Sequence, residues 1–118
     1  MKLPTEALDA YFETALWSST EMDELNTPLD ENYDVNDISP ELRAEAEQEL
    51  ADFIKLAGHL LGKQPLTLIA HDFWLTRCGH GAGFWDGDYE HGEELTKLCK
   101  PYGNVDLYVG DDNLIHSM

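Results

Sequence analysis

The chain has 118 residues, 42% of them hydrophobic, which suffices for one domain whose core needs no disulfides. Its 24 acidic side chains outnumber the 7 basic ones, and the formal net charge of −17 argues against direct binding to DNA, RNA or an anionic membrane surface. Two cysteines, Cys78 and Cys99, are too few for a disulfide framework and indicate free thiols in a reducing compartment.

The first predicted elements are a helix over residues 5–17 and an acidic connector over residues 21–38. Five apolar side chains of the helix share one face at helical spacing, namely Leu8, Tyr11, Phe12, Ala15 and Leu16. The connector has no basic residue, and its Asn, Pro and Thr residues disfavour helix or strand. A loop of this length is usually functional or mobile.

The longest predicted helix follows the connector. Ser39 is a favourable N-cap with Pro40 at the first helical position, and Gly62 is expected to end the helix as its C-cap. An apolar stripe runs between them, and the helix would be about 33 Å long at a rise of about 1.5 Å per residue. The acidic residues near its outer side are Glu41, Glu45, Glu49 and Asp52.

The middle of the chain predicts a first β-hairpin. Residues 65–70 are a short apolar run that fits either a strand or a short helix. Residues 72–77 are rich in aromatic and β-preferring types and predict a strand. A glycine-rich turn at residues 78–81 would connect this strand to a returning strand at residues 82–86.

The last part of the chain predicts a helix from about residue 89 to 100 and a second hairpin. Its strands would cover residues 105–109 and 114–116. The whole order of elements predicts one α+β domain over residues 1–118, with an acidic loop at 21–38. We expect a small antiparallel sheet of two hairpins with helices packed on one of its faces.

Residues 71–86 hold the densest set of chemically versatile side chains. A small enzyme would need to gather several of them in one pocket, and the candidates are His71, Asp72, Arg77, His80, Trp85 and Asp86. A zinc site would draw on Cys78, His80, His91 and Cys99, whose spacing is not that of paired zinc ligands. A calcium loop beginning at Asp86 fails because Lys97 stands at its last ligand position. We favour a structural role for this stretch and predict no catalytic residue, metal or cofactor.

The same stretch carries a resemblance, together with a segment near the end of the chain. The segments are residues 71–77 (His-Asp-Phe-Trp-Leu-Thr-Arg), 79–86 (Gly-His-Gly-Ala-Gly-Phe-Trp-Asp) and 106–115 (Asp-Leu-Tyr-Val-Gly-Asp-Asp-Asn-Leu-Ile), with further agreement at 16–19 and 28–33. They resemble a family of small acidic proteins encoded by tailed bacteriophages. Relatives often carry Asn at the position of Cys78, which argues against a zinc or thiol role there. The resemblance implies an origin in phage, and no chemistry comes with it.

The expected location is the cytoplasm of the infected bacterium. Residues 1–6 contain no apolar stretch of the kind that a signal peptide needs, and no apolar run approaches the length of a membrane span. Small phage proteins without a catalytic signature commonly bind and inhibit a host protein. The expected function is therefore inhibition or modulation of a host nucleic-acid-binding protein, as an anti-defence or host-takeover factor.

Charge supplies the physical route for such binding. Duplex DNA carries one phosphate charge per roughly 1.7 Å, and acids along the long helix and the connector could imitate that charged edge. The predicted partner-binding residues are Glu21, Asp23, Glu24, Asp30, Glu31, Asp34, Glu41, Glu45, Glu49 and Asp52. We expect the partner to be a basic host protein such as a nuclease, a restriction or CRISPR effector, or part of the transcription machinery. A small enzyme or metal-binding protein using residues 71–91, and a virion component, are the alternatives; the oligomeric state stays open, a homo-oligomer included.

Overall fold

The computed structural model describes residues 3–21, 25–79, 83–86 and 89–118, and an α+β fold is confirmed within them. The helices and strands are α1 (Thr5–Ser18), α2 (Pro40–Ala57), α3 (Leu66–Arg77), α4 (Gly92–Cys99), β1 (Leu107–Val109) and β2 (Ile115–Ser117). Short 3-10 turns connect them, namely η1 (Leu29–Glu31), η2 (Val35–Asp37), η3 (Gly58–Leu61), η4 (Phe84–Asp86) and η5 (Lys100–Tyr102).

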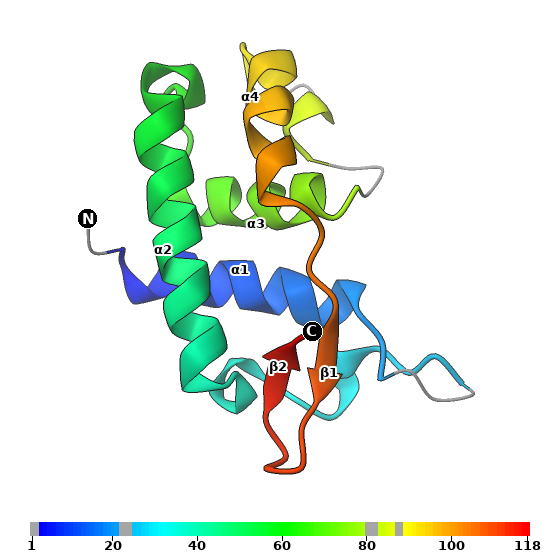
Figure 1. Ribbon diagram of the computed structural model, residues 1–118. Coiled ribbons are helices and arrows are strands. Elements are labelled where there is room, and N and C mark those ends of the chain that lie inside the picture. Colours follow the sequence, from blue (N-terminus) through cyan, green and yellow to red (C-terminus); the bar gives the residue numbers. More distant parts are fainter. Residues whose placement is uncertain (1–2, 22–24, 80–82, 87–88) are drawn as a thin grey trace.

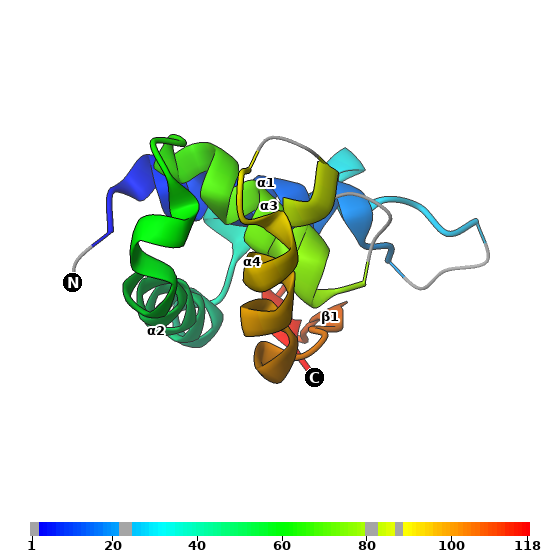
Figure 2. The same ribbon diagram turned by 90° about the horizontal axis from the view of Figure 1, so that it is seen from above.

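The helices form two layers (Figure 1, Figure 2). One layer holds α1 and α3 side by side, and the other holds α2, α4 and the β1–β2 hairpin, which lie across them. Aromatic rings fill the space between the layers. The ring centroids of Phe53 on α2 and Phe73 on α3 are 4.7 Å apart. Within the α1–α3 layer, Tyr11 meets Trp74 edge-on at 5.3 Å. Each such pair contributes about 0.5–1.5 kcal/mol beyond the apolar area that it buries.

The long helix begins where the sequence predicts and ends earlier. The Ser39 hydroxyl accepts a hydrogen bond from the backbone N–H of Leu42 at 3.2 Å, and Pro40 occupies the first helical position. Gly58 ends α2 because its φ of 51° is a conformation that favours glycine, and η3 then leads to Gly62. The 18 residues of α2 are about 27 Å long rather than the expected 33 Å.

The first predicted hairpin is wrong, because residues 66–77 form the helix α3. Eight of its 12 residues are buried, since α1, α2, α4 and the turns η4 and η5 surround it. A helix that is apolar on most of its sides loses the 3.6-residue pattern by which sequence analysis recognises an amphipathic helix. Its aromatic and β-branched residues then resemble a strand, and tertiary packing overrides that local preference. The returning strand is absent too, since η4 occupies residues 84–86.

The second predicted hairpin is confirmed, with strands displaced by one or two residues. Tyr108 lies opposite His116 in the antiparallel pair, and Asn113 adopts a φ of 63° in the connecting turn. The backbone N–H of Ser39 donates to the carbonyl of Ile115 at 3.0 Å, which ties β2 to the start of α2. The helix before the hairpin, α4, begins at Gly92, later than the expected start near residue 89. Glycine fits this position because a Cβ there would collide with the carbonyl oxygen of Phe84.

The described part of the acidic connector follows the surface of the two layers. It contains η1 and η2, and Leu29 is fully buried. Asp34 and Asp37 each accept a backbone hydrogen bond at the ends of η2, at 2.8 and 2.9 Å. The backbone of Leu29 also donates to Ser19 at 2.9 Å. Among all the residues that the structure describes, no helix is long and apolar enough to span a bilayer.

Candidate functional site

Acidic residues are distributed unevenly along the chain and over the fold. Fifteen of the 24 lie in residues 3–54 with a single base, Arg43, whereas the other nine share residues 55–118 with five bases. Figure 1 shows η1, η2, the start of α2 and the β1–β2 turn together at the lower end of the molecule. We call this region the acidic end, and its acidic residues are Asp30, Glu31, Asp34, Asp37, Glu41, Asp111 and Asp112.

A stripe of carboxylates continues from the acidic end along α2. Glu41, Glu45 and Asp52 are exposed and lie on one side of the helix, at positions separated by about one and two turns. The amide of Gln48 lies between them and donates to Asp52 at 3.1 Å. From Glu41 to Asp52 the stripe extends for roughly 16 Å along the helix axis. We call these three acidic residues the α2 stripe.

Glu49, which the sequence assigns to the same surface, has a different role. Its carboxylate makes a bidentate pair with the guanidinium of Arg77, with N–O distances of 2.9 and 3.2 Å. The Arg77 side chain is 2% exposed and that of Glu49 is 31% exposed. Because this carboxylate neutralises a buried cation, Glu49 is not available to a partner, and the predicted array loses one member.

Arg77 is satisfied at every donor. Its Nε donates to the carbonyl of Gly103 at 2.8 Å, and its terminal nitrogens donate to Glu49, to the carbonyl of Tyr102 at 2.8 Å and to the hydroxyl of Tyr11 at 3.1 Å. These acceptors account for the five N–H groups of a guanidinium. Burial lowers the pKa of Arg77, but the hydrogen bonds and charges of Glu49 and Tyr11 outweigh it and raise that pKa above its ordinary value. For Tyr11 burial has the opposite effect and raises the pKa of the phenol. Arg77 therefore joins α1, α2, α3 and η5 as a structural clamp.

The predicted acidic residues of the connector fall into two groups. Asp30, Glu31 and Asp34 are exposed at the acidic end, as expected. Glu21 is half-buried and accepts a hydrogen bond from the side chain of Asn32. Asp23 and Glu24 lie outside the described residues.

The pocket expected for a small enzyme does not form among those of its candidate residues that the structure describes. His71, Asp72 and Arg77 all belong to α3 but point to different neighbours. Nδ1 of His71 lies 2.8 Å from the hydroxyl of Thr14, whereas the buried carboxylate of Asp72 accepts from the hydroxyl of Tyr89 at 2.8 Å. Arg77 is held in its clamp on yet another side. The indole of Trp85 is partly exposed, and His80 and the side chain of Asp86 lie outside the described part of the chain.

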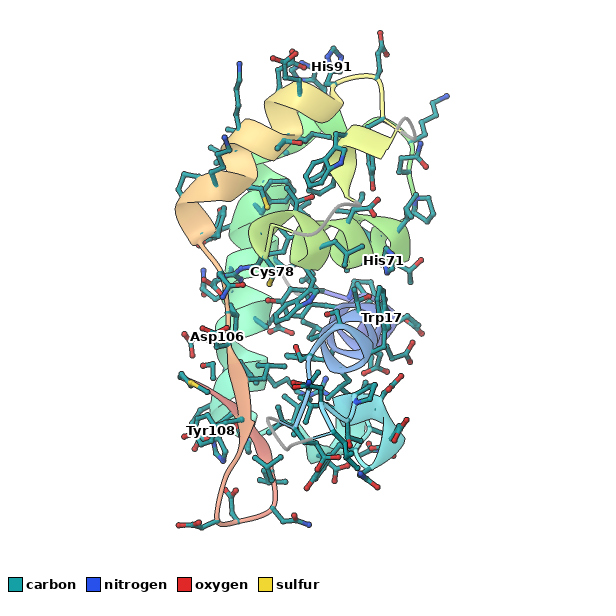
Figure 3. All side chains as sticks on the ribbon, turned by 90° about the vertical axis from the view of Figure 1, so that its right-hand side faces the viewer. Trp17, His71, Cys78, His91, Asp106 and Tyr108 are labelled. Atoms are coloured by element: carbon teal, nitrogen blue, oxygen red, sulfur yellow. The ribbon has the colours of Figure 1, made fainter. Side chains whose placement is uncertain are left out.

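The two cysteines are separate and weakly acidic. Cys99 is fully buried, with its Sγ 3.6 Å from the carbonyl oxygen of Phe73, and burial raises the pKa of its thiol to about 12. Cys78 is half-buried and lines a cavity of about 430 Å³ together with Trp74 and Asp106 (Figure 3); burial raises its pKa too. His91 pairs with Glu94 on α4. Within the described ranges, no group of three or more His, Cys, Asp or Glu residues could hold a metal ion.

The exposed aromatic residue Trp17 was not among the site residues predicted from the sequence. Trp17 lies on α1, opposite the apolar stripe that packs on the core, and its side chain is 48% exposed. Tryptophan is enriched at binding hot spots, so its position on the polar face of an amphipathic helix was an available signal.

Comparisons of the chain with protein-family models, with curated proteins and with solved structures find no match.

Proposed function

We propose that this protein is an acidic binding protein that occupies a cationic surface of another protein. The partner is a nucleic-acid-binding factor of a bacterial host, such as a nuclease, a restriction or CRISPR effector, or part of the transcription machinery. By covering the basic surface that would otherwise contact phosphates, the protein inhibits or modulates that factor. The resemblance of residues 71–77 and 106–115 to tailed-phage proteins supports the setting in an infected cell.

The observation that carries this proposal is the concentration of carboxylates on the acidic end and the α2 stripe. Among the described residues of this array, Asp112 has an ion-pair partner, His116, at 3.0 Å. An even scatter of charge would provide solubility alone, whereas a concentrated array produces a local field that steers a cationic partner. Arg43 is the only base in residues 3–54, and it is engaged with Asp9 at 3.7 Å and with the carbonyl of Val35 at 3.0 Å. The array thus keeps most of its charge for a partner.

The test is the salt and charge dependence of binding to a basic protein recovered from bacterial lysate. Affinity should fall steeply between about 50 and 200 mM salt, as expected when charged groups release counterions. The variant Glu41→Gln, Glu45→Gln, Asp52→Asn should weaken binding by at least about tenfold, since losing even one close charge pair at an interface costs about 1.5 kcal/mol or more.

The matched control removes three charges from another part of the surface. Glu90, Glu93 and Glu94 are exposed at the start of α4, and their replacement by Gln changes the net charge by the same amount. The control should change affinity by less than about threefold, because these charges lie outside the proposed contact surface and salt screens their longer-range attraction to the partner. Binding that ignores salt, or that falls equally in both triple variants, would show that the acidic array is not the contact surface.

A further inference from the structure

Trp17 lies near His71 (Figure 3), with their ring centroids 6.3 Å apart, and lines two surface grooves. The groove on the side of the connector has a volume of about 370 Å³, and Tyr33, Val35, Asp30 and Asp34 are among its walls. The groove on the side of α3 has a volume of about 420 Å³ and includes Leu68 and His71. Glu13, one helical turn before Trp17, lines both grooves. We call Trp17 and these two grooves the Trp17 surface.

The Trp17 surface carries negative charge that no base of the described chain neutralises. Glu13 and Asp30 take part in none of the ion pairs found in the described ranges. Arg43 contacts Asp9, the Val35 carbonyl and the ring of Phe12, and it lines neither groove. Asp34 takes part in none of these ion pairs either, so a ligand would meet the carboxylates of Glu13, Asp30 and Asp34 beside the exposed indole without a competing cation from the described chain.

His71 contributes an acceptor to the same surface. The single hydroxyl hydrogen of Thr14 is donated to the carbonyl of Ala10 at 2.7 Å. The 2.8 Å contact between that hydroxyl and Nδ1 of His71 therefore requires the imidazole to donate. In the neutral ring Nε2 is then left with a lone pair, so His71 adds an acceptor rather than a donor.

We propose that the Trp17 surface binds an arginine side chain in a basic segment of the partner protein. A guanidinium is planar, stacks on an indole face and carries five donors without an acceptor, which matches an aromatic face ringed by acceptors. The ammonium of lysine fits less well because it is a compact, strongly hydrated charge that does not stack. The inference rests on the proposed function and deepens it, since it names the group on the partner that is recognised.

The indole N–H signals of the three tryptophans provide an internal test by NMR. Trp17 reports the proposed site. Trp74 is buried, with Nε1 donating to the hydroxyl of Ser18 at 2.8 Å, and reports the integrity of the fold. Trp85 is exposed to a similar extent, but in its groove Glu90 and Glu93 are balanced by Lys97 and Lys100. It therefore controls for unspecific stacking of guanidinium groups on an exposed indole without an excess of carboxylates.

The probes are tetra-arginine, tetra-lysine and tetra-citrulline peptides with blocked ends. Tetra-arginine should shift the Trp17 signal saturably, and it should bind about threefold more tightly than tetra-lysine, as expected for a cation–π contact at an exposed site. Tetra-citrulline keeps the shape without the charge and should produce no saturable shift. The variant Glu13→Gln, Asp30→Asn should weaken tetra-arginine binding about tenfold, and the charge-matched variant Glu93→Gln, Glu94→Gln by less than about twofold.

Four results would each overturn the inference. Three are equal shifts of Trp17 and Trp85, equal affinities for the two cationic peptides, and equal losses in the two double variants. Unchanged tetra-arginine affinity in a folded Trp17→Ala protein would do the same. If both peptides bind in a salt-sensitive way and this binding is lost in the α2 stripe variant, the proposed function still holds. The Trp17 surface is then not the site of binding. Absence of binding to either peptide, together with a partner that ignores salt, would remove both.

Discussion

The buried clamp around Arg77 allows a quantitative prediction of stability. Replacing Arg77 by Met keeps most of the side-chain volume but removes the guanidinium. Tyr11 and the carbonyls of Tyr102 and Gly103 then lose their donor, and Glu49 loses its counter-charge. Breaking a buried ion pair costs about 3–5 kcal/mol, and we expect about 3 kcal/mol because Glu49, at 31% exposed, can recover some hydration.

That cost translates into a measurable shift of the melting temperature. With an unfolding entropy of about 2.1 cal/mol/K per residue, a chain of 118 residues unfolds with about 0.25 kcal/mol/K. A loss of about 3 kcal/mol should therefore lower Tm by about 12 °C. The assay is thermal unfolding at neutral pH followed by circular dichroism, with urea unfolding as a second measurement of the free energy.

Arg43→Met is the matched control for this prediction. Arg43 is 33% exposed, pairs with Asp9 at 3.7 Å and donates one hydrogen bond to the carbonyl of Val35 at 3.0 Å, so its loss should cost about 1 kcal/mol, well below the cost at Arg77. Glu49→Gln should fall between the two variants, because glutamine keeps the volume and one acceptor oxygen. If Arg77→Met were no more destabilising than Arg43→Met, the reasoning about the clamp would be refuted.

Three further predictions concern a helix cap, a close approach and the thiols. Ser39→Ala should lower the free energy of unfolding by about 1 kcal/mol, because the first turn of α2 loses its cap; urea titration measures this, and an unchanged midpoint would contradict it. Gly92→Ala should cost about 1–3 kcal/mol, since a Cβ there meets the backbone oxygen of Phe84, whereas a well-folded variant of wild-type stability would exclude this packing. The free energy of unfolding should fall as the pH rises from 9.0 towards 12. The Cys99 thiol ionises in the unfolded chain near its ordinary pKa of 9.0, but only at about 12 in the folded protein. The contribution of this one thiol is at most about 1.4 kcal/mol per pH unit. Cys99→Ala should flatten that slope, and iodoacetamide should label Cys78 in the native protein and Cys99 only after unfolding, as mass spectrometry can check.

Local signals in the sequence were sufficient for the elements whose two faces differ in polarity. The helix at residues 5–18 and the start of the helix at Pro40 are amphipathic or capped, so spacing and cap residues identify them. The turn at residues 110–113 marks the second hairpin in the same way. The helix α3 escaped recognition because it is buried on most sides, and burial on most sides erases periodicity.

The candidate site could be predicted by region rather than by residue. Acidic residues at the start of α2 and in η1 are exposed as expected. Glu49 and Arg77 are 28 residues apart in the chain, and no short-range pattern indicates that one neutralises the other. The grooves beside Trp17 bring together α1, the connector and α3, so they too depend on how distant segments pack.

The sequence by itself determined the excess of negative charge, the α+β class, the amphipathic helices and the closing hairpin. These properties follow from composition, from caps and from periodicity within a few neighbouring residues. Only the tertiary structure decided which carboxylates stay free, which one is paired with a buried arginine, and which tryptophans face solvent. Pairing and exposure depend on contacts between segments far apart in the chain, and burial changes the free energy of a charge or an aromatic ring far more than its neighbours in sequence do.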